Sequence, residues 1–183
     1  MTALINASTS AGVVVTSDTS GSLAFQSNGT TIATISSTGL TMNSGNIVVA
    51  STAAPAFSAY AGSATSLSGG AFTKVIFDTE EFDTNNNFAS SRFTPTIAGY
   101  YQINASVSIG INTQLVASIY KNGGEAKRGN NVTSNSNGSG VNSVIYFNGS
   151  TDYVEIYCFA GTTTNCNTGS NLTYFNGSLI RSA

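Results

Sequence analysis

The stretch from Phe77 to Ile103 carries an aromatic or apolar side chain every few residues, with polar loops between them. Its four phenylalanines are too unevenly spaced for one face of a helix. They are Phe77, Phe82, Phe88 and Phe93. This spacing favours short strands joined by tight turns, each directing one ring into a shared core. From Ile97 to Ile103 the pattern has the period of two that is typical of a strand, and Gly99 allows a bend or a close backbone approach.

From Phe72 onward the pattern predicts further strands separated by polar loops at residues 84–91, 124–140 and 161–171. The last two loops are long and consist mostly of Asn, Ser, Thr and Gly, so we expect them to lie at the ends of a β-sandwich. The tripeptide Asn122-Gly123-Gly124 predicts a hairpin turn.

A separate hairpin pattern fills the first part of the chain. Short apolar runs at 23–26 and 31–35 flank Ser27-Asn28-Gly29, and Asn-Gly between such runs is a strong hairpin signal. A second hairpin is predicted to join 40–42 to 47–49. We therefore divide the chain into an N-terminal β-hairpin segment, 1–52, and a C-terminal domain, 53–183.

The N-terminal segment has too little apolar surface to fold as isolated hairpins. It would be stable if three copies wrapped around one axis and buried their apolar side chains against each other. The candidates for this trimer packing are Leu23, Phe25, Ile32, Ile35, Leu40, Met42, Ile47 and Val49.

Composition narrows the classes of function. Charged residues make up 8% of the 183 residues, and the net charge is −2 with six Lys plus Arg, against the roughly 25% charged residues of ordinary soluble domains. So few scattered cations predict no binding to nucleic acid through phosphates and no attraction to an anionic membrane. No apolar run reaches the ~18 residues of a membrane span, and the first residues are a poor secretory signal.

The residues needed for common catalytic chemistry are sparse. The chain has no histidine and no tryptophan, which excludes a histidine-based triad and a histidine-ligated zinc site. The acidic cluster at 78–83 falls on a strand-to-loop edge, so we expect no enzyme and no cofactor. Asp83, Asn85 and Asn87 could offer oxygen ligands to calcium, but solvated edge charges are the simpler interpretation.

Three further residue types leave alternatives open. Lys121, Lys127 and Arg128 flank the predicted turn at Asn122-Gly123-Gly124 and could bind an acidic sugar or a partner's carboxylate, or could simply be solvated. Cys158 lies on a predicted strand and Cys166 in a polar loop. They could be two free thiols or form a disulfide. Most tyrosines fall on predicted strands, as core or subunit-interface residues.

Part of the chain resembles the signature of the C1q/TNF-like jelly roll: Phe, five residues, Asn or Asp, four residues, an aromatic, a short spacer, Phe, five residues, Gly-x-Tyr. The residues in these places are Phe77, Asp83, Phe88, Phe93, Gly99 and Tyr101. The spacer between Phe88 and Phe93 is shorter than usual, and Ile103 and Ala105 replace the family's next aromatics. Four segments resemble family strands in order: Pro55–Tyr60, Leu115–Gly123, Asp152–Ile156 and Phe175–Ile180.

This resemblance implies an all-β C1q/TNF-like jelly-roll sandwich and a homotrimer. Two stretches, Ser17–Thr30 and Ser36–Leu40, also resemble β-hairpin pieces of bacteriophage virion proteins. We therefore expect a structural protein on the virion surface. The N-terminal segment would bind a capsid or tail protein, and the head would act as a small fibre or receptor-binding tip for a host receptor or glycan.

Two alternatives remain open from the sequence. The first is a capsid decoration trimer that clamps the head of the particle. The second is a secreted C1q-like carbohydrate-binding module, against which the poor signal sequence and the lack of collagen-type repeats argue.

Overall fold

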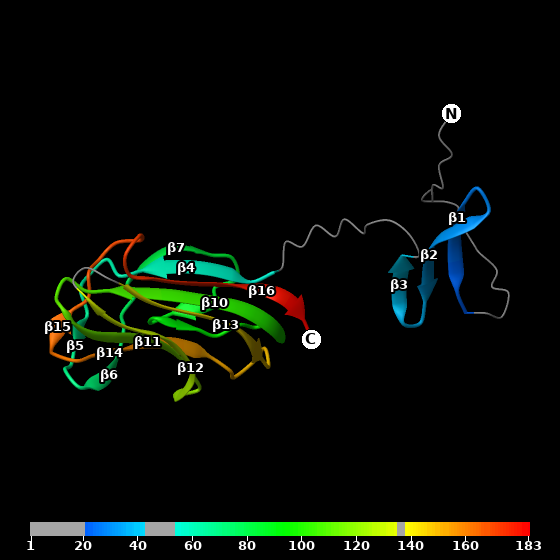
Figure 1. Ribbon diagram of the computed structural model, residues 1–183. Coiled ribbons are helices and arrows are strands. Elements are labelled where there is room, and N and C mark those ends of the chain that lie inside the picture. The colour runs from blue at the N-terminus through cyan, green and yellow to red at the C-terminus, as the bar shows by residue number, and fades with distance from the viewer. Residues whose placement is uncertain (1–20, 43–53, 135–137) are drawn as a thin grey trace. The chain divides into compact units, whose positions relative to one another are not determined.

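The computed structural model describes residues 21–42, 54–134 and 138–183, and these residues form strands, turns and loops without a helix (Figure 1). Within these ranges no helix is long and apolar enough to cross a membrane. The chain divides into two compact units, Met1–Ala50 and Ser51–Ala183, which are described separately.

The N-terminal unit contains a three-stranded antiparallel sheet in the order β1-β2-β3. Its strands are β1 (Leu23–Ser27), β2 (Thr30–Ser36) and β3 (Gly39–Met42). Asn28 and Gly29 join β1 to β2 with φ angles of 50° and 77°, as a two-residue Asn-Gly turn requires, so the first predicted hairpin is confirmed. β3 pairs with β2, while the second predicted hairpin continues into 43–49, outside the described residues.

The C-terminal unit is a sandwich of two five-stranded sheets, ordered β13-β10-β16-β4-β7 and β12-β11-β14-β9-β8, with a small β15-β5 pair. The strands are β4 (Ala56–Tyr60), β5 (Ser66–Leu67), β6 (Ala71–Lys74), β7 (Thr79–Asp83), β8 (Phe88–Ala89), β9 (Arg92–Phe93), β10 (Gly99–Ser108), β11 (Thr113–Lys121), β12 (Gly124–Ser134), β13 (Gly138–Phe147), β14 (Val154–Ala160), β15 (Thr164–Asn165) and β16 (Tyr174–Ser182).

Strand β10 shows how the sequence pattern builds this sandwich. Tyr101, Ile103 and Ala105 are buried in the core, whereas the residues between them face outward, as the period of two predicts. A Cβ on Gly99 would lie 2.4 Å from the carbonyl oxygen of Arg181 in β16. Gly99 is therefore the close-approach position that the sequence predicts.

Phenylalanine rings from both sheets meet in the core. Phe57 of β4 stacks on Phe93 of β9 at 4.2 Å between ring centroids, and on Phe88 at 5.1 Å. Phe77 is also buried. The expectation that Phe82 shares this core is wrong: its side chain is 51% exposed, because β7 is an edge strand and Phe82 pairs with Ser58 on the outer face.

The predicted loop at 124–140 is also wrong, because most of it is strand. β12 pairs with β11 along its length, and Asn122 and Gly123 form the tight turn between them, as predicted. Ser139 of β13 is fully buried, accepts a hydrogen bond from the Ala117 amide and donates one to the carbonyl of Asn130. Backbone pairing and buried serine hydroxyls stabilise this segment in place of apolar side chains.

Both cysteines are free thiols inside the core. Burial raises the pKa of Cys158 to about 12. Cys166 is also buried, although the sequence places it in a polar loop, because its backbone bridges to Ile109 and its sulfur accepts the amide N–H of Thr65 at 3.1 Å.

Candidate functional site

The outer face of the β13-β10-β16-β4-β7 sheet is the first candidate site, and we call it the uncharged face. It is defined by Tyr100, Gln102, Asn104 and Ser106 of β10, Asn142, Val144 and Tyr146 of β13, Asn176 and Ser178 of β16, and Ser58 of β4. None of these residues carries a charge, and the nearest charges lie at the margins of the face, where Arg181 of β16 is opposite Tyr100 and Glu81 of β7 accepts the Ser58 hydroxyl. Tyr100, Val144 and Tyr146 are 43–49% exposed, so the face presents large apolar groups to solvent.

Side-chain amides organise the middle of the uncharged face. Gln102 donates to the Asn104 oxygen, and Asn104 donates to the Asn176 oxygen, both at 3.0 Å. Two shallow hollows of about 340 and 370 Å³ flank this row, and Asn104 and Asn176 line both. At one end the rings of Tyr100 and Tyr146 lie 5.5 Å apart. The face therefore combines aromatic groups with oriented amides, a composition suited to a protein interface.

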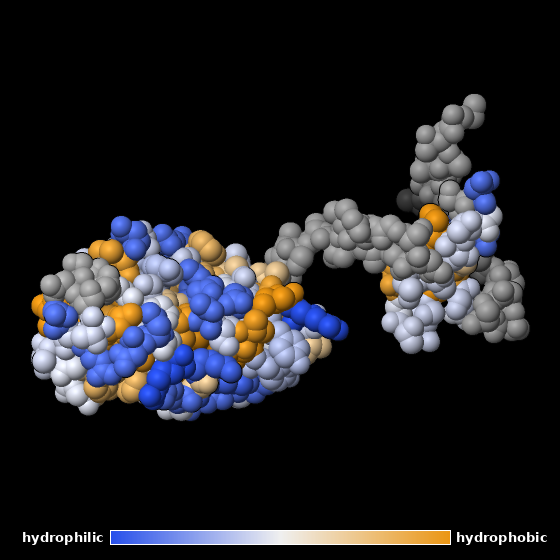
Figure 2. Space-filling view, in the orientation of Figure 1, coloured by the Kyte–Doolittle hydropathy of each residue, from blue (hydrophilic) through white to orange (hydrophobic). Residues whose placement is uncertain are grey.

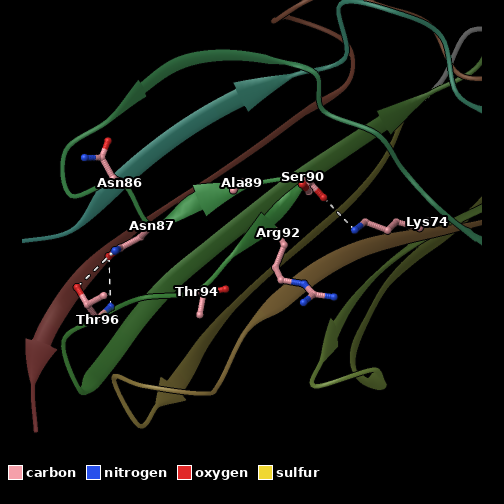
Figure 3. Close-up of a pocket in the computed structure, with 8 residues that line it drawn as sticks. All are labelled: Lys74, Asn86, Asn87, Ala89, Ser90, Arg92, Thr94 and Thr96. Carbon is pink, nitrogen blue, oxygen red and sulfur yellow. Dashed lines mark hydrogen bonds between the residues drawn. The ribbon is translucent and has the colours of Figure 1, made fainter.

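A second candidate lies around the β8–β9 hairpin and is shown in Figure 3. This hollow of about 470 Å³, which we call the cationic hollow, is lined by Lys74, Asn86, Asn87, Ala89, Ser90, Arg92, Thr94 and Thr96. Lys74 comes from β6 and Arg92 from β9, and both point toward the same space. The lining contains two positive charges and no negative one.

A buried carboxylate holds these two cations together. Glu155 of β14 has a side chain only 4% exposed, and its Oε1 lies 2.7 Å from the Lys74 ammonium and 2.9 Å from Arg92 Nε. Burial alone would raise the pKa of Glu155, but the hydrogen bonds and positive charges of Lys74 and Arg92 outweigh it and lower the pKa. One negative charge thus faces two positive ones.

The positions of both cations are fixed by further contacts. The Arg92 guanidinium lies 3.8 Å above the ring of Tyr153, a cation–π contact. Lys74 also donates to the carbonyl of Ser90 at 3.0 Å. Ser90 itself has a φ of 53°, as part of the tight β8–β9 turn. The two cations are therefore held in place before any ligand binds.

The predicted calcium ligands lie in the adjacent loop and are engaged within it. Asp83 accepts the amides of Asn85 and Phe88, and the Asn87 oxygen accepts the amide of Thr96. A cation would have to displace these donors. Within the described ranges no three His, Cys, Asp or Glu side chains gather as a metal site.

The structure does not bring Lys121, Lys127 and Arg128 together. Lys121 pairs with Asp152 at 2.8 Å, and Arg128 pairs with Glu125 and lies over the ring of Phe72. Lys127 and Arg128 alternate along β12 and so point to opposite faces. The expected cation cluster is therefore not formed. Successive side chains of a strand point to opposite faces, so Lys127 and Arg128 are separated.

The residues of the cationic hollow are those that sequence reasoning missed. Lys74, Arg92 and Glu155 lie far apart in the chain and on three different strands. The available signal was weak: Glu155 is a charged residue inside an otherwise apolar strand, Val154–Ala160, and a buried carboxylate requires partners. Finding those partners required the sheet order.

Comparison with solved structures shows the fold. The globular domain of zebrafish complement 1qA superposes with a TM-score of 0.57 at 19% identity, covering 71% of this chain and 99% of that one. The C-terminal unit is a C1q/TNF-like jelly roll. Murine APRIL matches with a TM-score of 0.57 at 11% identity over 69% of this chain and 99% of its own. Eiger TNF from S. frugiperda matches at 0.54 and 9%, over 71% and 93%.

These likenesses to C1q and TNF domains concern the fold only, because the identities are low. A search of protein-family models finds no match, and a search of curated proteins finds none either. The expected all-β jelly roll is confirmed.

Proposed function

We propose that this chain is a non-enzymatic structural protein of a bacteriophage virion, a surface-exposed homotrimer that acts as a small fibre or receptor-binding tip. The single structural observation that carries the homotrimer in this proposal is the uncharged face. It exposes Tyr100, Val144 and Tyr146 on a sheet whose middle carries amide and hydroxyl side chains, with the charges of Arg181 and Glu81 at its margins.

The absence of charge suits association of identical copies. In a closed trimer two different patches of each copy meet head to tail, and only residues close to the threefold axis face their own copies. A charge close to the axis would approach its own kind, and a charge elsewhere in the contact would need a partner, whereas amides and tyrosine hydroxyls can donate to and accept from one another. C1q/TNF jelly rolls are trimers, which supports three as the number of copies.

The N-terminal sheet supports the same proposal independently. Register places Leu23 opposite Ile35, and Ile35 opposite Leu40, so these three share one face. They are 39–53% exposed, as is Phe25 at 40%. Ile32 lies on the other face of β2, and the packing candidates Ile47 and Val49 lie outside the described residues, as does the side chain of Met42. Three copies together would cover the shared apolar face.

The virion role rests on the resemblance of Ser17–Thr30 and Ser36–Leu40 to phage β-hairpin pieces. In this proposal the N-terminal unit binds a capsid or tail protein, and the jelly roll faces outward. A head made of three copies multiplies weak contacts through avidity. A decoration trimer on the capsid is distinguished by where the protein sits: labelled protein at the tail tip supports the fibre, and many copies across the head would overturn it.

A charge placed on the uncharged face tests association. Val144→Glu would bury a carboxylate without a partner in the contact between copies, so we expect the variant to be monomeric by light scattering where the parent chain is trimeric. Thr162→Glu adds the same charge in an exposed loop and should leave the trimer intact. A Val144→Glu variant that remains trimeric would refute this face as the interface.

A further inference from the structure

We propose that the cationic hollow binds the carboxylate of an acidic sugar. This site is separate from the uncharged face, because Arg92 and Glu155 belong to the β12-β11-β14-β9-β8 sheet. If the hollow binds no sugar, the trimer proposal is unaffected. If the chain is not a trimer, the proposal for the hollow is equally unaffected.

The first argument is charge. Lys74 and Arg92 share one carboxylate, Glu155, and no acidic side chain lines the hollow. One positive charge therefore remains without a counter-ion there. The side chains of Lys74 and Arg92 are 27% and 43% exposed, so an anion can reach both from solvent.

The second argument is the count of donors. Lys74 has three N–H donors, of which Glu155 and the Ser90 carbonyl take two. Arg92 has five, and those on Nε and Nη2 face Glu155, while Nη1 has no partner among the described residues. Donors on two fixed cations thus remain for a ligand. A carboxylate can accept hydrogen bonds at both of its oxygens.

The third argument is the size and polarity of the space. About 470 Å³ is far more than a bare anion fills, and it lies within the ~300–1,000 Å³ range of small-molecule sites. Besides the cations, the lining offers hydroxyls and amides, including Thr94, Thr96 and Asn86 around the rim (Figure 3). These groups suit the hydroxyls of a sugar ring. A ligand with one carboxylate and several hydroxyls therefore matches the hollow better than a simple anion or an apolar acid.

Fixed geometry makes the site selective. Glu155 is buried, and Arg92 is stacked on Tyr153 at 3.8 Å, so little side-chain freedom is lost when a ligand binds. The hairpin that carries Ala89 and Ser90 is anchored by Ser91, whose hydroxyl accepts the Phe77 amide at 2.8 Å. Neutral sugars, which cannot use the surplus charge, should bind much more weakly.

The test is calorimetric titration of the full chain with a glucuronic acid disaccharide and, in parallel, with the matching glucose disaccharide. We expect the acidic sugar to bind at least tenfold more tightly. Equal affinity for the two, inorganic sulfate binding as tightly as the acidic sugar, or no binding of the acidic sugar at millimolar concentration would each overturn the proposal.

Variants locate the binding. Arg92→Gln should weaken the acidic sugar at least tenfold, whereas Lys127→Gln removes an equal charge from β12 outside the hollow and should change affinity less than twofold. Should Arg92→Gln fail to fold, Asn86→Asp serves instead, because it is nearly isosteric and adds a negative charge at the rim. Asn86 has a φ of 52°, which aspartate tolerates. Unchanged affinity in Asn86→Asp, or an equal loss in Lys127→Gln, would contradict the assignment.

Discussion

Glu155 shows how much one residue can decide in a chain with few charges. Its sequence neighbours on β14, Val154 and Ile156, are apolar, and its own side chain is buried. A buried carboxylate without partners is unfavourable, so the fold has to supply Lys74 and Arg92. The same ion triad that makes the burial tolerable also creates the cationic hollow, so stability and the proposed binding share one origin.

Replacing Glu155 with Gln should reduce stability. The change leaves Lys74 and Arg92 without their counter-ion, although both can turn partly toward water. We expect a loss of about 2 kcal/mol, the scale of hydrogen bonds to charged groups, measured as the free energy of unfolding in urea at pH 7. A loss below a few tenths of a kcal/mol would show that the triad contributes nothing.

The same carboxylate predicts a dependence on pH. The pKa of Glu155 is lower in the folded chain than its ordinary value of 4.5 because, against the opposing effect of burial, its hydrogen bonds to two cations dominate. Its contribution is therefore complete above pH 4.5 and is lost as the pH falls through the lowered folded value. Side-chain hydrogen bonds also lower the pKa of Asp78, Glu125 and Asp152.

Denaturation at a series of pH values checks this. Glu155→Gln should lose less stability than the parent chain between pH 5 and pH 2, but should keep some acid sensitivity from the other three carboxyls. Parallel curves for the two proteins would rule out the contribution of Glu155.

Close contact between strands is the decisive feature at the scale of elements. β10 and β16 approach so closely at Gly99 that a Cβ would lie 2.4 Å from the Arg181 oxygen, whereas a Cβ on Gly140 of β13 would meet nothing nearer than 3.9 Å. Gly99→Ala should therefore cost about 1–3 kcal/mol, as overpacking does, and Gly140→Ala should be nearly neutral. Thermal unfolding of both variants tests this, and equal shifts in Tm would contradict it.

The burial of both thiols is a second property of packed elements. Cys158 is fully buried on β14 and Cys166 is 2% exposed, and burial raises the pKa of Cys158 to about 12. At pH 8 iodoacetamide should modify neither thiol in the folded chain on a timescale of hours, but both within minutes in guanidinium. Mass spectrometry reads the result, and rapid modification of the folded chain would mean that the core opens there.

The sequence predicted the features that are set by neighbouring residues and missed those that depend on residues far away in the chain. Alternation along β10 and the Asn-Gly turns at Asn28 and Asn122 are local, and they were predictable. The exposure of Phe82 and the length of β12 depend on which strand lies at an edge and which strand pairs, and these are set by residues far away. The cationic hollow was the least predictable feature from the sequence. Lys74 and Arg92 come together only because β6 and β9 both border β14.

At the scale of the whole molecule, both units expose apolar groups of the kind that single chains usually bury. The jelly roll presents the uncharged face, and the N-terminal sheet presents Leu23, Phe25 and Ile35. Figure 2 shows apolar surface, in orange, interspersed with polar surface, in blue, on the visible side of the C-terminal unit. A trimer would cover the exposed apolar groups of each unit.

The mass of the full chain in dilute solution, measured by light scattering at physiological salt, tests this account most directly. Three copies predict three times the chain mass of 18.7 kDa, and with so little charge involved the value should not change between low and high salt. A mass of one chain at micromolar concentration would contradict the account.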